Sequence, residues 1–322
     1  MITRRHFIAT SSTAVASLAS TPFAFAANGL KDKTLVLGFQ KTGIPLVARQ
    51  LKVFEKRFEP QGIKVEWAEF TSGLTLLQSV DSGDVAFGNA GNVGCIFLQA
   101  SGGKVTYVAA QPSAPKSEGI LVKDASTIRS ITDLKGRKVG YAKGSSSHNL
   151  IAAALETQGL DIHAITTVAL GAADAAFAFD NGSIDAWAIW DPYFSIAQVR
   201  NKTRVLAWQG DVLKNNAGFL LTNSDFAKQH PQHVKDLIDG SAEAGRWAKA
   251  NLGEVTKSLS AATGIPADVL AEVNRNASFD VGPLTAPILD AQQQTADRLF
   301  KLGVIPKRVN IREIVWAHAA AS

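Results

Sequence analysis

Cysteine is nearly absent from this sequence, in which Cys95 is the only one. A single thiol excludes an intrachain disulfide, although the N-terminus predicts export to an oxidising compartment. Cys95 lies in the apolar run VGCIFL. We therefore expect its side chain to be buried and to pack as a small apolar residue.

Long hydrophobic runs are missing as well. No stretch reaches 18 uninterrupted apolar residues, the length expected of a membrane-spanning helix, so we expect the mature chain to be soluble. The composition, 46% hydrophobic and 19% charged, is ordinary for a globular protein. At roughly 100–200 residues per domain, the chain length predicts two domains.

The sequence also lacks the patterns that mark common enzyme classes. It contains no GxxxxGK[ST], GxGxxG, HExxH or GxSxG motif. Ser146 and His148 are near neighbours, but such positions on a loop entering a helix point in different directions, which argues against a nucleophile–base pair. His230 and His233 have no third ligand nearby, which argues against a zinc site. We expect no catalytic residue, no metal and no other cofactor.

Acidic residues are absent from the N-terminal segment, which reads MITRRHFIATSSTAVASLASTPFAFAANG. Arg4 and Arg5 precede a weakly apolar stretch, and Ala24 and Ala26 are the small residues that signal peptidase reads. Residues 1–26 therefore predict a signal peptide, cleaved near Ala26, and a periplasmic location. The paired arginines favour a twin-arginine export signal, and a general secretory signal is the alternative.

The remaining charge is small. The whole chain carries +5, and removal of the signal peptide with its two arginines leaves about +3. Such a mild balance argues against a nucleic-acid partner.

Strand-like and helix-like segments alternate along the mature chain. Their alternation predicts βαβ units and largely parallel sheets, and hence an α/β protein. Residues from 225 onward read as mostly helical. The pattern predicts strands at 34–39, 63–67, 85–88, 138–141 and 185–190, and helices at 44–56, 74–83 and 149–158.

The α/β pattern occurs twice without a long linker between the two occurrences. This predicts two lobes built from interrupted chain segments, with short crossovers near residues 119–122 and 217–221. We expect lobe 1 to comprise residues 27–120 plus 220–322 and lobe 2 to comprise residues 121–219. Lobes joined in this way close around a ligand by hinge motion.

Uncharged hydrogen-bond donors collect at four of the predicted strand-to-helix corners. A helix N-terminus leaves backbone N–H groups unpaired and carries partial positive charge. An anion there gains roughly 0.3–1 kcal/mol, and each hydroxyl bond to a charged acceptor adds about 1.5–3 kcal/mol. The sequence therefore predicts an oxyanion site that needs no arginine. The four corners are residues 40–43, 71–73, 88–92 and 144–147.

Three consecutive serines occupy the last of these corners, in the run KGSSSHNLIAAAL. One of them, Ser145 or Ser146, is expected to cap the helix, which leaves the others free to donate to a ligand oxygen. Sulfonate, sulfate ester and nitrate all suit such a site, because each spreads one negative charge over three acceptor oxygens. The alternative is a solvated cap without a ligand.

Aromatic residues gather in the run WAIWDPY. Trp187 and Trp190 face opposite sides of the predicted strand, so at most one of them belongs to the core on a given side. Trp190 ends the strand beside the Asp191–Pro192 turn, a position for lining a cleft; plain packing is the alternative. Asp191 either caps the turn or contacts a ligand.

Several of these segments together resemble a known family. The runs FTSGLTLLQSVDSGDVAFGNAGN, LKGRKVGYAKGSSSHNLIAAAL, NGSIDAWAIWDPY and QQQTADRLFKLGVIPKRVNI are similar to the aliphatic sulfonate-binding proteins of ABC importers. These proteins group with the taurine- and nitrate-type periplasmic binding proteins. The resemblance extends from about residue 34 to residue 316.

The resemblance implies an α/β, type II periplasmic binding fold with two lobes joined by a short two-stranded hinge. It implies a monomeric receptor that binds an organosulfur anion between the lobes and delivers it, for sulfur acquisition, to an inner-membrane permease and ATPase. We include His148 beside the serines in the expected site. The expected ligand-binding residues are Gln40, Ser72, Gly73, Asn92, Ser145, Ser146, Ser147, His148, Trp190 and Asp191.

The position of Asn92 bears on the choice of ligand. Members of the family often carry an acidic residue there, so this chain is expected to lack one negative charge in its cleft. An alkane- or arylsulfonate or a sulfate ester is then favoured over taurine. The alternatives are a receptor for taurine, nitrate or a vitamin precursor and, from another class, a secreted enzyme on the same fold.

Overall fold

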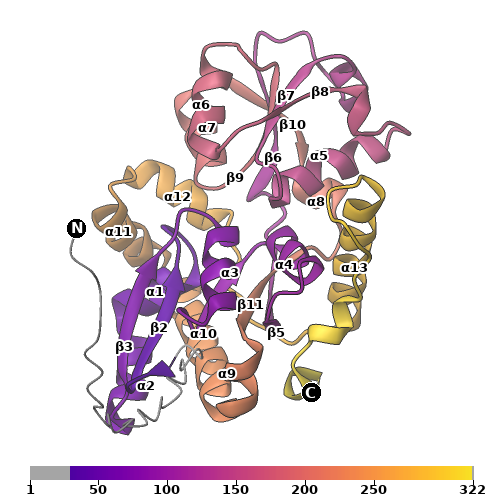
Figure 1. Ribbon diagram of the computed structural model, residues 1–322. Helices are drawn as coiled ribbons and strands as arrows, with labels where there is room; N and C mark the ends of the chain where they lie inside the picture. Colours follow the sequence, from indigo (N-terminus) through magenta and orange to yellow (C-terminus); the bar gives the residue numbers. More distant parts are fainter. Residues whose placement is uncertain (1–29, 321–322) are drawn as a thin grey trace, which may run out of the picture.

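The computed structural model describes residues 30–320, whose strands form two separate sheets (Figure 1). Each sheet and the helices packed on it form one lobe. Lobe 1 consists of residues 30–112 and 217–320, and lobe 2 of residues 118–212. The predicted signal peptide lies outside the described residues.

The sheet of lobe 1 has six strands. Its order is β1-β2-β4-β11-β5, with β3 paired to β2. β3 and β4 run parallel to β2, whereas β11, which returns from lobe 2, is antiparallel to both β4 and β5. The strands are β1 (Leu30–Lys31), β2 (Thr34–Phe39), β3 (Lys64–Glu69), β4 (Phe87–Ala90), β5 (Val105–Pro112) and β11 (Ala217–Asn223).

The sheet of lobe 2 repeats this plan with five strands in the order β10-β6-β9-β7-β8. β8 and β9 run parallel to β7, and β6, which arrives from lobe 1, is antiparallel to β9 and β10. The strands are β6 (Glu118–Lys123), β7 (Lys138–Tyr141), β8 (Thr166–Ala169), β9 (Ala186–Trp190) and β10 (Thr203–Trp208).

Helices cover both sheets (Figure 1). Lobe 1 carries α1 (Ile44–Leu51), α2 (Val53–Phe58), α3 (Gly73–Ser82), α4 (Asn92–Ala100), α9 (Ser224–Gln229), α10 (Pro231–Ala250), α11 (Leu252–Thr263), α12 (Ala267–Arg275) and α13 (Ala286–Lys301). Lobe 2 carries α5 (Ser146–Glu156), α6 (Ala172–Asp180), α7 (Tyr193–Arg200) and α8 (Gln209–Val212). Short 3-10 turns are η1 (Glu59–Gln61), η2 (Ile131–Leu134), η3 (Ile162–Ala164), η4 (Ile311–Ile314) and η5 (Ala317–Ala320). Among the described residues, no helix combines the length and the apolar character needed to cross a membrane.

The predicted single helix at 44–56 is wrong, because the structure has two helices there. Lys52 adopts a left-handed conformation, with φ of 54°, and separates α1 from α2. The turn lets Phe54 and Phe58 of α2 enter the same core cluster as Leu46 and Val47 of α1. Apolar spacing continues through the turn, so the sequence pattern does not reveal it.

Two short segments, residues 113–117 and 213–216, connect the lobes. Ser113 N–H donates to Asn216 O at 2.9 Å and joins the two segments, and Gly210 N–H of α8 donates to Pro115 O at 2.9 Å. β6 belongs wholly to the sheet of lobe 2 and β11 wholly to that of lobe 1. The crossovers therefore lie a few residues before the predicted boundaries at 120/121 and 219/220.

The lobes also contact each other on both sides of these crossovers. On one side Arg298 of α13 bonds to Glu156 at 2.7 Å and to Asn149 at 2.8 Å, both on α5 (Figure 1). On the other side Arg200 of α7 bonds to Asp268 of α12 at 3.0 Å. The two lobes are therefore in direct contact on both flanks of the crossovers.

The packing of α10 against the segment that follows α12 requires a glycine. A Cβ atom on Gly245 would lie 2.1 Å from the carbonyl oxygen of Phe279. We expect Gly245→Ala to lower the free energy of unfolding by about 1–3 kcal/mol, because backbone atoms must move to admit the methyl group. Gly253→Ala is the control, since no atom lies within 4 Å of its added Cβ; it should gain up to about 1 kcal/mol. Urea unfolding measures both, and equal stability of Gly245→Ala and the unmodified protein would contradict the packing.

Candidate functional site

A cavity of about 730 Å³ lies between the lobes. Its wall is formed largely by residues that follow the carboxyl ends of parallel strands, the position at which α/β sheets bind ligands. Gln40 follows β2, Ser72 follows β3 and Asn92 follows β4 in lobe 1, whereas Ser145 follows β7 and Asp191 follows β9 in lobe 2. The two sheets therefore direct equivalent edges toward one space.

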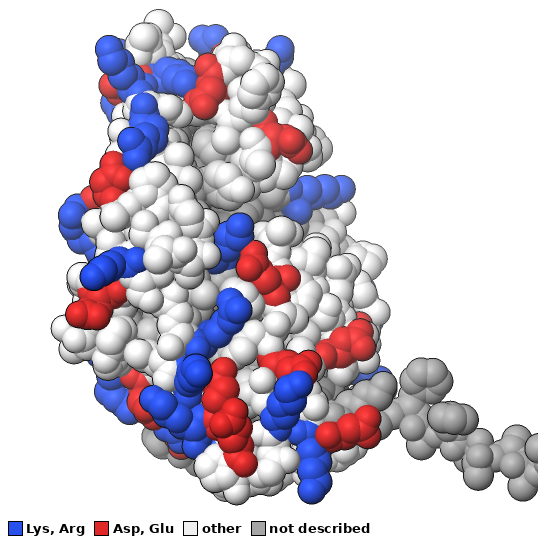
Figure 2. Space-filling view, turned by 90° about the vertical axis from the view of Figure 1, so that its left-hand side faces the viewer, with Lys and Arg blue, Asp and Glu red and all other residues white. Residues whose placement is uncertain are grey.

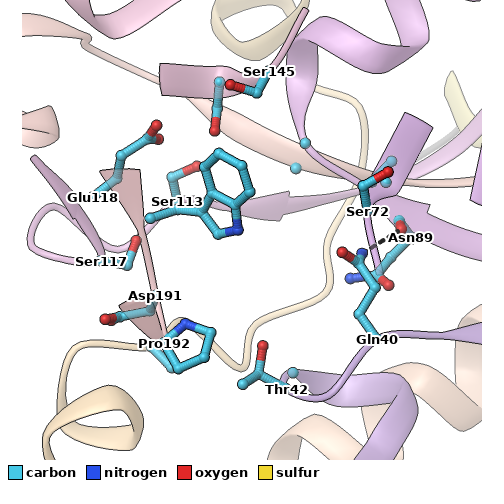
Figure 3. Close-up of a pocket in the computed structure, with 18 of the residues that line it drawn as sticks. Gln40, Thr42, Ser72, Asn89, Ser113, Ser117, Glu118, Ser145, Asp191 and Pro192 are labelled. Atoms are coloured by element: carbon cyan, nitrogen blue, oxygen red, sulfur yellow. Dashed lines mark hydrogen bonds between the residues drawn. The ribbon is translucent and has the colours of Figure 1, made fainter. Parts of the chain in front are cut away.

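Figure 3 shows how the labelled side chains surround this space. Ser117, Glu118 and Asp191 lie on one side, and Ser72 and Asn89 lie on the other. Both lobes therefore contribute polar groups that a single small molecule can contact at once.

Five helices begin at the cavity, and the residue before each lines it; the first turn of one of them, α7, is capped by Asp191. Ser72 accepts from Thr75 N–H at 3.3 Å and so caps α3. α1, α4 and α5 have no side-chain cap. Their first-turn N–H groups and the positive ends of their dipoles are thus available to an anion. The residues before the five helices are Gly43, Ser72, Gly91, Ser145 and Pro192.

The three serines before and within α5 differ in their partners and in their exposure to the cavity: Ser145 bonds to the backbone, whereas Ser146 and Ser147 both bond to Glu118. Ser145 occupies the N-cap position, but its hydroxyl donates to Ala142 O at 2.7 Å and does not cap the helix. Ser146 lines the cavity and hydrogen-bonds to Glu118. Ser147 is fully buried and its hydroxyl donates to Glu118 Oε1 at 2.9 Å. The predicted site includes Ser147, but the structure places it behind the cavity wall, where its hydroxyl donates to the buried carboxyl of Glu118.

His148 also belongs to the predicted site and also lies behind the wall. Its ring stacks on that of Tyr141 with centroids 4.8 Å apart, and its Nδ1 accepts from Gly144 N–H at 3.4 Å. Burial, and then the charge of Lys143, lowers the pKa of His148 to about 4. The imidazole is therefore neutral at physiological pH, and its hydrogen bond from Gly144 holds the loop before α5 on its buried side.

Glu118, the first residue of β6, is the main cavity residue that the sequence analysis misses. Its side chain is 5% exposed and lines the cavity. Burial raises its pKa to about 7, against the lowering effect of the bonds from Ser147 and Ser146, and the charge of Asp191 raises it further. The available signal was a lone acidic residue at the start of the apolar run GILV, next to a predicted crossover.

Asp191 has one role that its sequence position predicts. Its Oδ1 accepts from Ser195 N–H at 2.9 Å and from the Ser195 hydroxyl at 2.6 Å, which caps the first turn of α7. Its Oδ2 is buried and has no hydrogen-bond partner. Burial raises the pKa of Asp191 to about 6, although the two bonds from Ser195 oppose this shift.

The two tryptophans of β9 both contact the same hydrophobic cluster of lobe 2, but they differ in burial. Trp187 is 2% exposed and packs against Phe179 in the core of lobe 2. Trp190 is half-buried and lines the cavity. An aromatic surface therefore stands next to the polar groups at the carboxyl end of β9.

The other predicted residues of lobe 1 all line the cavity. Gln40 Nε2 donates to Asn89 O at 3.5 Å (Figure 3). Asn92 is almost fully buried, and its Nδ2 donates to Oδ1 of Asn216 at 2.8 Å. Asn216 lies in one of the crossovers and is absent from the predicted site. A Cβ on Gly73 would lie 3.1 Å from Cβ of Ala90, so this glycine allows α3 to approach β4.

Cys95 is buried in α4, as the apolar run around it predicts. Its Sγ donates to Gly91 O at 3.4 Å, and burial raises the pKa of the thiol to about 12. The sulfur therefore stays protonated and helps to position the loop before α4.

Charges outside the cavity are mixed. On the face shown in Figure 2, basic and acidic side chains are interspersed. At the cavity itself, Lys41 lies 3.8 Å from Glu69, and both side chains are largely exposed.

Comparisons with known proteins agree with this geometry. Residues 55–253 match the NMT1/THI5-like family, and the chain belongs to that family. The chain is 36% identical, over 301 residues and 93% of each chain, to an aliphatic sulfonates-binding protein of Escherichia coli (strain K12). It is 32% identical, over 88% of its length and 86% of the relative's, to a protein of the same description from Bacillus subtilis (strain 168).

Solved structures show the same relationship. The periplasmic aliphatic sulphonate binding protein SsuA from Escherichia coli superposes with a TM-score of 0.83 at 35% identity, covering 89% of this chain and 92% of that one. The alkanesulfonate-binding protein SsuA from Xanthomonas axonopodis pv. citri, bound to MOPS, also gives 0.83 at 33% identity, covering 89% and 99%. The predicted α/β periplasmic binding fold is thereby confirmed. The desulfurization enzyme DszB, at 16% identity and a TM-score of 0.65, shares the fold alone.

The raised pKa of Glu118 makes stability depend on pH. The folded protein holds a proton on this carboxyl up to a pH of about 7, whereas the unfolded chain releases it near the ordinary value of 4.5. The free energy of unfolding should therefore decrease as the pH rises from about 4.5 to 7, by on the order of a few kcal/mol. Glu118→Gln should show a smaller decrease, with the contribution of Asp191 remaining. Urea unfolding at several pH values tests this, and identical pH profiles for the two proteins would refute it.

Proposed function

We propose that this protein is an exported solute receptor that binds an organic sulfonate or sulfate ester in the cavity between its lobes. It then delivers the ligand to an inner-membrane ABC permease and its ATPase for sulfur acquisition. The observation that carries the proposal is the meeting of three uncapped helix N-termini, those of α1, α4 and α5, at one cavity beside an aromatic side chain.

The headgroup is proposed to bind where the helices begin. A sulfonate has three acceptor oxygens and one diffuse negative charge, so it suits several neutral donors. If three or four charge-assisted bonds form, the gross gain is about 5–12 kcal/mol. Ordering and desolvation reduce this sum, and we expect a micromolar Kd, which corresponds to about −8 kcal/mol.

The organic part of the ligand is proposed to lie against Trp190. The ring is half-buried, and Ile196 and Ile265 line the same cavity. Contact with residues of both lobes would stabilise the closed arrangement, since the ligand then binds that state more tightly than an open one. Gln40, Ser72, Gly73, Asn92, Ser145, Ser146 and Asp191 complete the proposed contact set.

The names of the similar proteins support the ligand class. Those of Escherichia coli and Bacillus subtilis are described as binding aliphatic sulfonates, and the Xanthomonas structure holds the sulfonate MOPS. We further propose a signal peptide of the twin-arginine type, a periplasmic monomer, an importer as partner and no enzymatic turnover.

The argument against taurine that rests on Asn92 does not hold. Glu118 and Asp191 bring two carboxyl groups to the cavity, so the cavity has acidic groups even with an amide at position 92. A taurine-binding periplasmic protein of Escherichia coli is 26% identical to this chain over 89% of its length. A charged amine on the ligand is therefore compatible with the site.

Calorimetry with the mature protein tests the proposed ligand class. The panel contains methanesulfonate, butane-1-sulfonate, benzenesulfonate, ethyl sulfate, taurine and nitrate. We expect micromolar binding of at least one organic sulfonate or sulfate ester and none of nitrate. Binding of nitrate alone would overturn the ligand class, and release of sulfite from a bound sulfonate would show an enzyme instead.

Substitutions at Ser146 separate backbone donation from hydroxyl donation. Ser146 is the first residue of α5, where proline is tolerated but removes the N–H, and Ser145 before it is extended, as a pre-proline residue should be. Ser146→Ala removes only the hydroxyl. We expect Ser146→Pro to bind the preferred sulfonate roughly tenfold more weakly than Ser146→Ala, because one charge-assisted bond is lost. Equal Kd values for the two variants would exclude this N–H from the site.

A further inference from the structure

The cavity wall carries acceptor oxygens that lack donors. Asn89 Oδ1, Asn92 Oδ1 and Asp191 Oδ2 are buried and have no hydrogen-bond partner, and all three residues line the cavity. Asn92 is 1% exposed, so bulk water does not reach it. Buried polar atoms are normally paired. A sulfonate group only accepts hydrogen bonds, so a ligand that satisfies any of these oxygens brings N–H or O–H donors of its own.

The carboxyl groups of the cavity also lack a cation. The ion pairs found among residues 30–320 involve neither Glu118 nor Asp191. The bonds to these two carboxyls come from serine hydroxyls and one backbone N–H, on Ser146, Ser147 and Ser195. Each acid disfavours ionisation of its neighbours, since Asp191 acts on Glu118 and Glu272 acts on Asp191.

The two acids lie next to the aromatic wall. Glu118 of β6 is the register partner of Trp190 in β9, and Asp191 follows Trp190 directly. Asp191 N–H donates to Ser117 O at 3.0 Å, which ties the two chain segments together. In Figure 3 Glu118 and Asp191 lie on one side of the space, opposite Ser72 and Asn89 near the N-termini of α3 and α4.

We propose that Glu118, Asp191 and Trp190 form a subsite for a cationic ammonium group, so that the preferred ligands are ammonio-alkanesulfonates. This inference rests on the proposed function, in which the sulfonate end lies at the helix N-termini. The ammonium end then lies beside the indole ring, which attracts cations, and within the field of the two carboxylates. Its N–H groups supply a donor to Asp191 Oδ2, and the zwitterion brings no net charge into the cavity.

Two ligands of nearly equal size isolate the ammonium group. 3-Aminopropane-1-sulfonate and butane-1-sulfonate differ only by a terminal NH₃⁺ in place of CH₃. At pH 7.5, calorimetry on the mature protein should give the aminosulfonate a Kd lower by roughly tenfold, which corresponds to about 1.4 kcal/mol. In Asp191→Asn and in Glu118→Gln the ratio of the two Kd values should fall below about threefold. Glu66→Gln, which removes a charge from β3 outside the cavity, should keep the ratio of the unmodified protein.

The outcomes separate this inference from the proposed function. Tighter binding of butane-1-sulfonate than of the aminosulfonate overturns the ammonium subsite and leaves the sulfonate receptor intact. An equal loss of the ratio in Glu66→Gln also overturns it, because the effect would then come from net charge. Failure of both ligands and of the whole sulfonate panel to bind overturns both proposals. If one cavity variant unfolds, as judged by circular dichroism, the other variant and the unmodified protein still decide the question.

Discussion

The site depends on one constraint of α/β topology, namely that helices begin at the carboxyl ends of parallel strands. β2, β3 and β4 in lobe 1 and β7 and β9 in lobe 2 all end at the same space. The chain crosses between the lobes twice, and the crossing strands β6 and β11 join each sheet antiparallel to their neighbours. This arrangement turns two similar sheets toward each other and brings helix dipoles from both into one cavity without any arginine in its wall.

Two buried acids form part of this wall, and their burial is energetically unfavourable. Glu118 and Asp191 have raised pKa values because burial disfavours their charged forms, and serine hydroxyls recover only part of the lost solvation. A chain optimised for stability alone would place apolar residues at these positions. Their presence beside Trp190 therefore lowers stability and is explained by a role in binding. Carboxyl groups with perturbed pKa values tend to lie at binding sites.

Much of the fold was predictable from periodicity. The predicted strands at 34–39, 63–67, 85–88, 138–141 and 185–190 correspond to β2, β3, β4, β7 and β9, because alternation and turn composition are local properties. Gln40, Ser72 and Ser145 lie in the corners after three of them. The other strands of the two sheets were not predicted. The turn at Lys52 was not predictable, since apolar spacing runs through it without a break. Nor were Glu118 and Asn216, which reach the cavity only because the crossovers bring distant segments together. The serine run lies at a strand-to-helix corner, as expected, but the partner of the Ser147 hydroxyl is a carboxyl 29 residues away in sequence.

The contact between α13 and α5 has a mechanical consequence. Arg298 and Glu156 are mostly buried, with side-chain exposures of 17% and 32%, whereas Arg200 and Asp268 on the opposite flank are 50% and 56% exposed. Dissolved salt screens exposed charges far more than buried ones. Added salt is therefore expected to weaken the ion pair between α7 and α12 more than the one between α13 and α5. The two lobes would then separate more easily on the α7–α12 flank than on the α13–α5 flank.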